Sequence, residues 1–179
     1  MRKLLIAILS AMLLVSCGKP QDPEDGLAIF KYNESAGILT LDPIYAKDLP
    51  HIWACNQVFN SLVAFDDQMN LVPMVAKSWD ISEDGKTYTF HLRDDVQFHE
   101  DTCFYQSALR QARGPRYVTA QDFVYSFNRV VDKTLNSPGL WIFSSVKHDD
   151  DHYAFTALDD TTFQIELAKP SRRFWAFSR

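Results

Sequence analysis

Apolar and polar residues alternate most clearly in residues 79–81 and 87–93. Because successive residues of a strand face opposite sides of a sheet, this alternation predicts two strands. Residues 83–86 contain an Asp-Gly pair and predict the hairpin turn between them. A third alternation, over residues 162–167, predicts a further strand. The residues expected to face inward in the hairpin are Trp79, Ile81, Tyr88, Phe90 and Leu92.

Two other stretches have apolar residues at helical spacing. The first covers residues 52–62, where Pro50 suits a helix start, and residues 63–65 are expected to continue its buried last turn. The second follows Thr119, which resembles the first residue of a capping box completed by Asp122. The expected apolar stripes are Ile52, Cys55, Val58, Phe59 and Leu62 in the first helix and Phe123, Phe127, Val130 and Val131 in the second.

Residues 28–33 are rich in aromatic and apolar side chains and predict a first strand, which stops at the turn-forming residues 33–37. Strands and helices follow one another irregularly, without internal repeats. This order predicts a mixed α/β domain rather than a helix bundle or a β-sandwich.

The first 16 residues have the features of an export signal. Arg2 and Lys3 precede an uncharged apolar run that is too short to span a bilayer. The run ends at Ser16-Cys17, which resembles a bacterial lipobox, so residues 1–16 are predicted to be a lipoprotein signal peptide and Cys17 its lipidated residue. An ordinary signal peptide that happens to end near a cysteine is the alternative. Several acyl chains on Cys17 would give firm membrane anchorage.

Residues 17–27 are polar, contain two prolines and predict a tether between the lipid and a folded domain. The net charge of −5 argues against a nucleic-acid partner. After lipidation of Cys17 two cysteines remain, Cys55 and Cys103. A disulfide between them and two free thiols are both compatible with the sequence.

No enzyme motif is present: the chain has neither a nucleophile elbow nor a phosphate-binding glycine loop nor a zinc-protease helix. No enzyme activity and no cofactor are therefore expected. Residues 99–103 contain metal-ligand side chains, but a solvated turn is favoured over a metal site because the ligands are nearly consecutive. Residues 149–152 are acidic but lack the alternation and glycine of a calcium loop.

Four tryptophans stand among many other aromatic residues. Trp53 and Trp79 are expected in the core, since each borders an apolar stripe. Trp141 follows a Pro-Gly pair in a predicted loop and is least explained by packing. It is therefore a candidate ligand contact.

Five sequence blocks in order resemble the extracellular solute-binding proteins of family 5, the peptide-, oligopeptide- and nickel-binding components of ABC importers. The resemblance runs from about residue 28 to about residue 170. Its blocks are Leu41-Asp42-Pro43, Asn56 to Val63, Leu71 to Trp79, Asp84 to His99 and Thr119 to Arg129.

The resemblance implies a periplasmic-binding-protein fold of type II (cluster C), in which two lobes close on a ligand. It places the hairpin and the Thr119 helix in an extra subdomain of the first lobe. The turn residues Asn33, Glu34, Ser35, Ala36 and Gly37 are implied to lie at the mouth of the ligand cleft. The implied partners are a peptide or other small solute, an ABC transporter permease and, through the lipid, a membrane of the cell envelope, with the domain on its periplasmic or extracellular side.

The chain departs from the family pattern in two respects. Family members are roughly three times longer, so residues 28–179 are expected to be an incomplete N-terminal lobe that binds solute weakly alone. Residues 102–117 are longer than the short turn expected before the Thr119 helix. A lipoprotein module for structure or protein interaction, and a nickel or haem carrier within the same family, are the alternatives to peptide capture.

Overall fold

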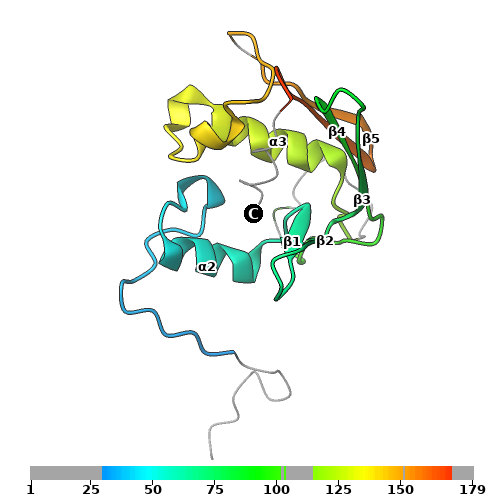
Figure 1. The fold of residues 1–179 in the computed structure, drawn as a ribbon. Helices are drawn as coiled ribbons and strands as arrows, with labels where there is room; N and C mark the ends of the chain where they lie inside the picture. Colours follow the sequence, from blue (N-terminus) through cyan, green and yellow to red (C-terminus); the bar gives the residue numbers. More distant parts are fainter. Residues whose placement is uncertain (1–29, 102, 104–114, 151, 171–179) are drawn as a thin grey trace, which may run out of the picture. The chain divides into compact units, whose positions relative to one another are not determined.

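The computed structural model describes residues 30–101, 103, 115–150 and 152–170 (Figure 1). The chain divides into two units, residues 1–35 and 36–179. In the first unit, residues 30–33 are not in a strand, so the predicted strand over residues 28–33 is wrong where the structure describes it. A strand requires a neighbouring backbone to pair with. None of the ladders or bridges among the described residues includes this segment.

The second unit combines helices with two antiparallel sheets. In chain order its elements are η1 (Pro43–Tyr45), α2 (Leu49–Val58), β1 (Val63–Phe65), β2 (Leu71–Pro73), β3 (Ala76–Ile81), β4 (Thr87–Leu92), α3 (Ala120–Val131), η3 (Lys133–Leu135), η4 (Leu140–Phe143), β5 (Phe155–Asp159) and β6 (Thr162–Glu166). The η elements are 3-10 helices.

The larger sheet has the strand order β3-β4-β6-β5. The predicted hairpin of β3 and β4 is confirmed, with Trp79 opposite Phe90. The next ladder places Phe90 opposite Phe163, which lies in the predicted strand over residues 162–167. Strand β5 was not predicted from the sequence. It pairs with β6 along the outer edge, and a bulge after Ala157 interrupts its register.

The hairpin turn lies where the Asp-Gly pair predicts it. Ser82 N donates to Thr87 O at 2.9 Å, and Gly85 N donates to Ser82 O at 2.8 Å. Gly85 has φ of +68°, a left-handed conformation that glycine adopts without steric cost. The inward-facing residues of β4 are buried as expected, whereas Ile81 in β3 is exposed. Ile81 lies opposite Tyr88 and therefore faces the predicted side of the sheet, but it is exposed because it lies at the end of the edge strand.

Helix α3 packs against β5 and β6. Its predicted capping box is confirmed, because Asp122 Oδ2 accepts hydrogen bonds from Thr119 N at 2.8 Å and Thr119 Oγ1 at 3.1 Å. The predicted stripe is also confirmed: Phe123 and Val131 are buried, and the remaining members pack partly buried against the same core.

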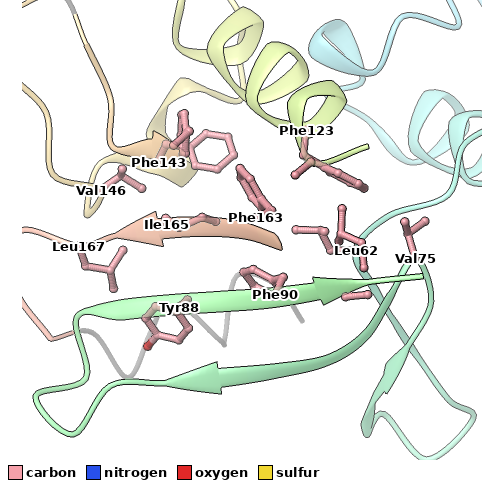
Figure 2. Close-up of a cluster of buried hydrophobic side chains, with 14 of the residues drawn as sticks. Leu62, Val75, Tyr88, Phe90, Phe123, Phe143, Val146, Phe163, Ile165 and Leu167 are labelled. Atoms are coloured by element: carbon pink, nitrogen blue, oxygen red, sulfur yellow. The ribbon is translucent and has the colours of Figure 1, made fainter. Parts of the chain in front are cut away.

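A cluster of buried side chains fills the space between α3 and the larger sheet (Figure 2). Phe163 lies at its centre and is fully buried. The centroid of its ring lies 6.2 Å from that of Phe90, 5.9 Å from Phe123 and 5.4 Å from Phe127. Two strands of the sheet and the helix therefore meet at this one side chain.

Helix α2 begins and ends earlier than predicted. Its last turn closes when Phe59 N donates to Cys55 O at 2.8 Å, and residues 63–65 form strand β1 with β2 instead of continuing the helix. The residues buried in α2 are His51, Ala54 and Cys55.

Several apolar residues of α2 and its C-cap are nevertheless exposed. Of the predicted stripe, Ile52, Val58 and Phe59 are exposed, so this part of the prediction is wrong. Trp53 is 53% exposed, and its predicted core position is also wrong. Trp79 is half-buried against the core, as predicted. Helical spacing identified the helix, but apolar residues on both of its sides hid which side faces inward.

Candidate functional site

Residues 39–44, called the 39–44 segment below, follow the predicted ligand turn and are tied to α2. Cys55 Sγ donates to Leu41 O at 3.6 Å, and Leu39 N donates to His51 Nε2 at 3.1 Å. Burial, together with the negative charge of Asp42, raises the pKa of the Cys55 thiol, so it remains a neutral donor.

The same contacts fix the tautomer of His51. Because Nε2 accepts from a backbone N–H, the ring proton of neutral His51 must lie on Nδ1. That nitrogen contacts Asp48 Oδ1, which also accepts from His51 N at 3.2 Å. The hydrogen bond from the His51 side chain is the largest cause that lowers the pKa of Asp48.

Asp42, within the 39–44 segment, ties this segment to α3. Asp42 Oδ2 accepts from Arg129 Nη2 at 2.7 Å, and Asp42 Oδ1 accepts from Arg129 Nη1 at 3.3 Å. This two-point pairing holds the pKa of Asp42 below its usual value and raises that of Arg129. Asp42 also caps η1, since Oδ1 accepts from Ile44 N at 3.3 Å.

A buried hydroxyl makes the third tie. Ser137 Oγ donates to Ile44 O at 2.8 Å and accepts from Gly139 N at 3.1 Å. Ser137 is buried, so the Ile44 carbonyl and the Gly139 N–H would both lose a hydrogen-bond partner without its hydroxyl. The 39–44 segment is therefore fixed by side chains from α2, from α3 and from the loop before η4.

The predicted ligand residues 33–37 lie at the junction of the two units. Ser35 and Ala36 form a turn, which confirms the turn prediction. In the first unit Tyr32 Oη donates to Glu34 Oε2 at 3.0 Å. In the second unit Gly37 has φ of +74° and open space beside its Cα. The structure thus places a short, accessible turn before the 39–44 segment, and ligand contact by Asn33, Glu34, Ser35, Ala36 and Gly37 stays a prediction.

Trp141 lies in η4, close in sequence to Ser137, and is 57% exposed. Its neighbours Leu140 and Ile142 are also exposed. The expectation that packing explains Trp141 poorly agrees with this exposure, whereas its contact with a ligand stays a prediction.

Several other predictions concern cysteines, metals and membranes. Cys17 lies outside the described residues. Cys55 is buried, Cys103 is exposed, and both thiols are free, so they form no disulfide. Asp101 Oδ1 accepts from Cys103 N at 2.8 Å, as in a solvated turn. Within the described ranges, no group of three or more His, Cys, Asp and Glu side chains could hold a metal ion, and no helix is long and apolar enough to cross a membrane.

The profile of the bacterial extracellular solute-binding proteins, family 5 Middle, matches residues 70–179, which is more than half of the chain. The chain belongs to this family. Family 5 is a family of solute-binding proteins, and membership of it agrees with the resemblance carried by the five sequence blocks.

Among the family 5 relatives is the periplasmic murein peptide-binding protein MppA of Escherichia coli, which is 34% identical over 142 residues. That match covers 73% of this chain and 24% of MppA. The chain therefore spans about a quarter of the length of this relative.

Solved family 5 structures share the fold of the described residues. Haemophilus influenzae OppA in complex with the peptide RPPGFSPFR matches with a TM-score of 0.65 and 26% identity, over 78% of this chain and 26% of OppA. Campylobacter jejuni NikZ in complex with Ni(L-His) matches with a TM-score of 0.61 and 30% identity, over 79% of this chain and 24% of NikZ. The described residues thus have the mixed α/β fold of part of a type II periplasmic binding protein, as predicted.

Sequence reasoning missed His51 and Ser137 as residues that hold the 39–44 segment. The order Asp48-Leu49-Pro50-His51 carried a usable signal, because an Asp cap followed by proline predicts the helix start and puts His51 in the first turn. Ser137 gave no comparable signal, since its partner is a backbone carbonyl 93 residues away.

Proposed function

We propose that this chain is part of the substrate-binding component of an ABC importer and that its substrates are peptides. Family membership carries the proposal, supported by relatives named for binding murein peptides and oligopeptides. The proposed role is capture and delivery to a permease, without catalysis and without a cofactor.

The proposed ligand contacts are residues 33–37 and Trp141. The turn supports the proposal because its backbone is accessible at Gly37, and backbone groups can bind a peptide whatever its side chains are. Trp141 supports it because an exposed indole offers an apolar face to a ligand.

The exposed apolar residues of α2 support the proposal that this chain is only part of a lobe. Residues such as Leu49, Trp53 and Phe59 leave apolar area in water that a complete lobe would bury. We propose that residues 28–179 supply part of an N-terminal lobe and that α2 packs on further polypeptide in the working protein. Binding by hinge closure needs two lobes, so the chain alone should bind peptide weakly.

For the N-terminus we propose residues 1–16 as a lipoprotein signal peptide, lipidated Cys17 as the membrane anchor and residues 17–27 as the tether. The domain would then lie in the cell envelope on the periplasmic or extracellular side. Labelled palmitate should be incorporated into the chain in bacteria and lost in Cys17→Ala. Cys103→Ala is the matched control, because Cys103 is exposed and free and should leave labelling unchanged.

Titration of ¹⁵N-labelled chain with a panel of di- to pentapeptides tests peptide capture. We expect amide shifts at residues 33–37 and in the Trp141 indole, with Kd of about 1 mM, near the weak end of specific binding. Micromolar binding would contradict the proposed incompleteness. Absence of any shift at peptide concentrations about ten times higher would contradict peptide capture.

A second candidate is transport of a nickel-histidine chelate. The observation that favours it is the match to NikZ, solved in complex with Ni(L-His). The same titration with nickel and L-histidine separates the two: shifts with the chelate but not with peptides would establish the second candidate in place of the first.

A further inference from the structure

His51 is a buried titratable residue that the proposed function does not use. It is 8% exposed and lies in the first turn of α2. Its two ring nitrogens bond in different directions: Nδ1 toward Asp48 and Nε2 toward Leu39 N, 12 residues earlier in the chain. One imidazole therefore connects the helix start to the 39–44 segment.

The contact with Leu39 exists only for neutral histidine. A protonated imidazole carries N–H on both nitrogens, so Nε2 would present a proton to the Leu39 N–H. Two donors then face each other where one donor and one acceptor were bonded. The Asp48 contact behaves in the opposite way, since a carboxylate also accepts from a charged ring. Protonation thus keeps the bond within α2 and breaks the bond to the 39–44 segment.

We propose that His51 is a proton-sensitive latch that holds the start of the 39–44 segment on α2 and releases it when the ring is protonated. Gly37 lies two residues before Leu39, so release frees the end of the predicted ligand turn. That consequence for ligand binding rests on the proposed function, whereas the latch itself does not.

The surrounding ionisable groups leave His51 as the group that switches. Asp48 and Asp42 have lowered pKa values and stay ionised between pH 5 and 8, the range in which histidine changes charge. Cys55, one turn further along α2, has a raised pKa and stays a neutral thiol. Arg129 stays cationic beside Asp42.

Two more ionisable side chains interact with the residues named above. Lys47 interacts electrostatically with Asp48, and Tyr45 of η1 interacts electrostatically with Arg129. Neither is bonded to Leu39 N. The Leu39 bond therefore reports the state of His51 directly.

Nuclear magnetic resonance of the ¹⁵N-labelled full chain tests the latch without any ligand. At about pH 8 the His51 ring should show the tautomer with its proton on Nδ1. At about pH 5 the protection factor of the Leu39 amide should fall with the charged fraction of the His51 ring, by about tenfold for a fully charged ring, the scale of one hydrogen bond. A ring proton on Nε2 at pH 8, or unchanged Leu39 protection while His51 becomes charged, would overturn the proposal.

Two variants sharpen the result. His51→Gln can place its Oε1 near the position of Nε2 and cannot titrate, so Leu39 should stay protected at both pH values. His51→Phe removes the acceptor and should leave Leu39 unprotected at both. If His51→Phe does not fold, His51→Gln alone tests the proposal. A fall of Leu39 protection with pH in His51→Gln would refute the latch. Peptide titrations that fail while these results hold would refute the proposed function alone.

Discussion

Asp42 and Arg129 lie 87 residues apart in the sequence and form a two-point ion pair, with Oδ2 and Nη2 2.7 Å apart. Each belongs to a different block of the family pattern, Leu41-Asp42-Pro43 and Thr119 to Arg129. The pair explains in physical terms why these two residue types are useful together: one caps η1 and the other extends from the last turn of α3. Their contact fixes the 39–44 segment against a helix that belongs to the main core.

Asp42→Asn should destabilise the fold in a pH-dependent way. Asparagine retains the cap of η1 but loses the charge, so unfolding free energy should fall by about 1 kcal/mol at neutral pH. The pKa of Asp42 is lowered in the folded chain, so the stabilisation is present above the ordinary carboxyl pKa and is lost as pH falls through the lowered value. Urea denaturation at a series of pH values should show the two curves converging in acid.

Asp95→Asn is the matched control for that charge. Asp95 pairs with Arg93, but both side chains are about half exposed or more. Its substitution should change stability little at any pH. An equal loss in both variants would mean that the Asp42 pair has no special role in holding the 39–44 segment.

Phe163→Ala should be the most damaging single change in the core. Phe163 is fully buried and touches rings from β4 and α3, so truncation should lower unfolding free energy by about 3–5 kcal/mol. Leu158→Ala, an exposed leucine on neighbouring β5, should stay within about 0.5 kcal/mol of the parent. Thermal or urea unfolding followed by circular dichroism measures both, and comparable losses would contradict the core as described.

Asp122→Ala should loosen the start of α3. It removes the acceptor of Thr119 N and the partner of Arg116, for a loss of about 1–2 kcal/mol. Hydrogen exchange at the first amides of α3 should accelerate, while exchange in the larger sheet should change less. Gln121→Ala, one residue earlier and exposed, is the control and should leave exchange at these amides unchanged.

Gly85→Ala should weaken the hairpin because of its backbone conformation. The nearest atom to an added Cβ is Pro170 Cβ at 3.6 Å, so space is adequate, but φ of +68° costs an L-residue about 1–2 kcal/mol. Gly139→Ala meets similar spacing at φ of −85°, which alanine adopts without strain, and should raise the free energy of unfolding by about 0.4–1 kcal/mol. Equal effects in urea denaturation would refute the backbone explanation.

The parts of the fold that the sequence predicted are those in which pattern and burial agree. In β4 and β6 every second residue is both apolar and buried, and in α3 the capping box and the stripe coincide. Strand β5 escaped prediction because Ala157 and Leu158 are adjacent apolar residues and a bulge breaks the alternation there. Residues 63–65 looked helical because three consecutive apolar residues fit either structure.

The candidate site was predictable only in its local part. The turn at residues 35–36 follows from turn-forming residues and was expected. The ties to His51, Arg129 and Ser137 join segments far apart in the chain, and no local pattern encodes them.

The strand order β3-β4-β6-β5 also determines the order in which the strands of the larger sheet can pair during synthesis. A polypeptide is synthesised from its N-terminus, so the β3–β4 hairpin is available long before residues 162–166, and Thr89 meets Gln164, which lies 75 positions further along the chain. An isolated hairpin is marginally stable, and closing so long a loop slows folding. Until β6 arrives, one edge of β4 has open backbone groups, and α3 lacks one of the two strands on which it packs. The newly made chain therefore passes through a stage in which the β3–β4 hairpin has an unpaired strand edge that can pair with the wrong strand.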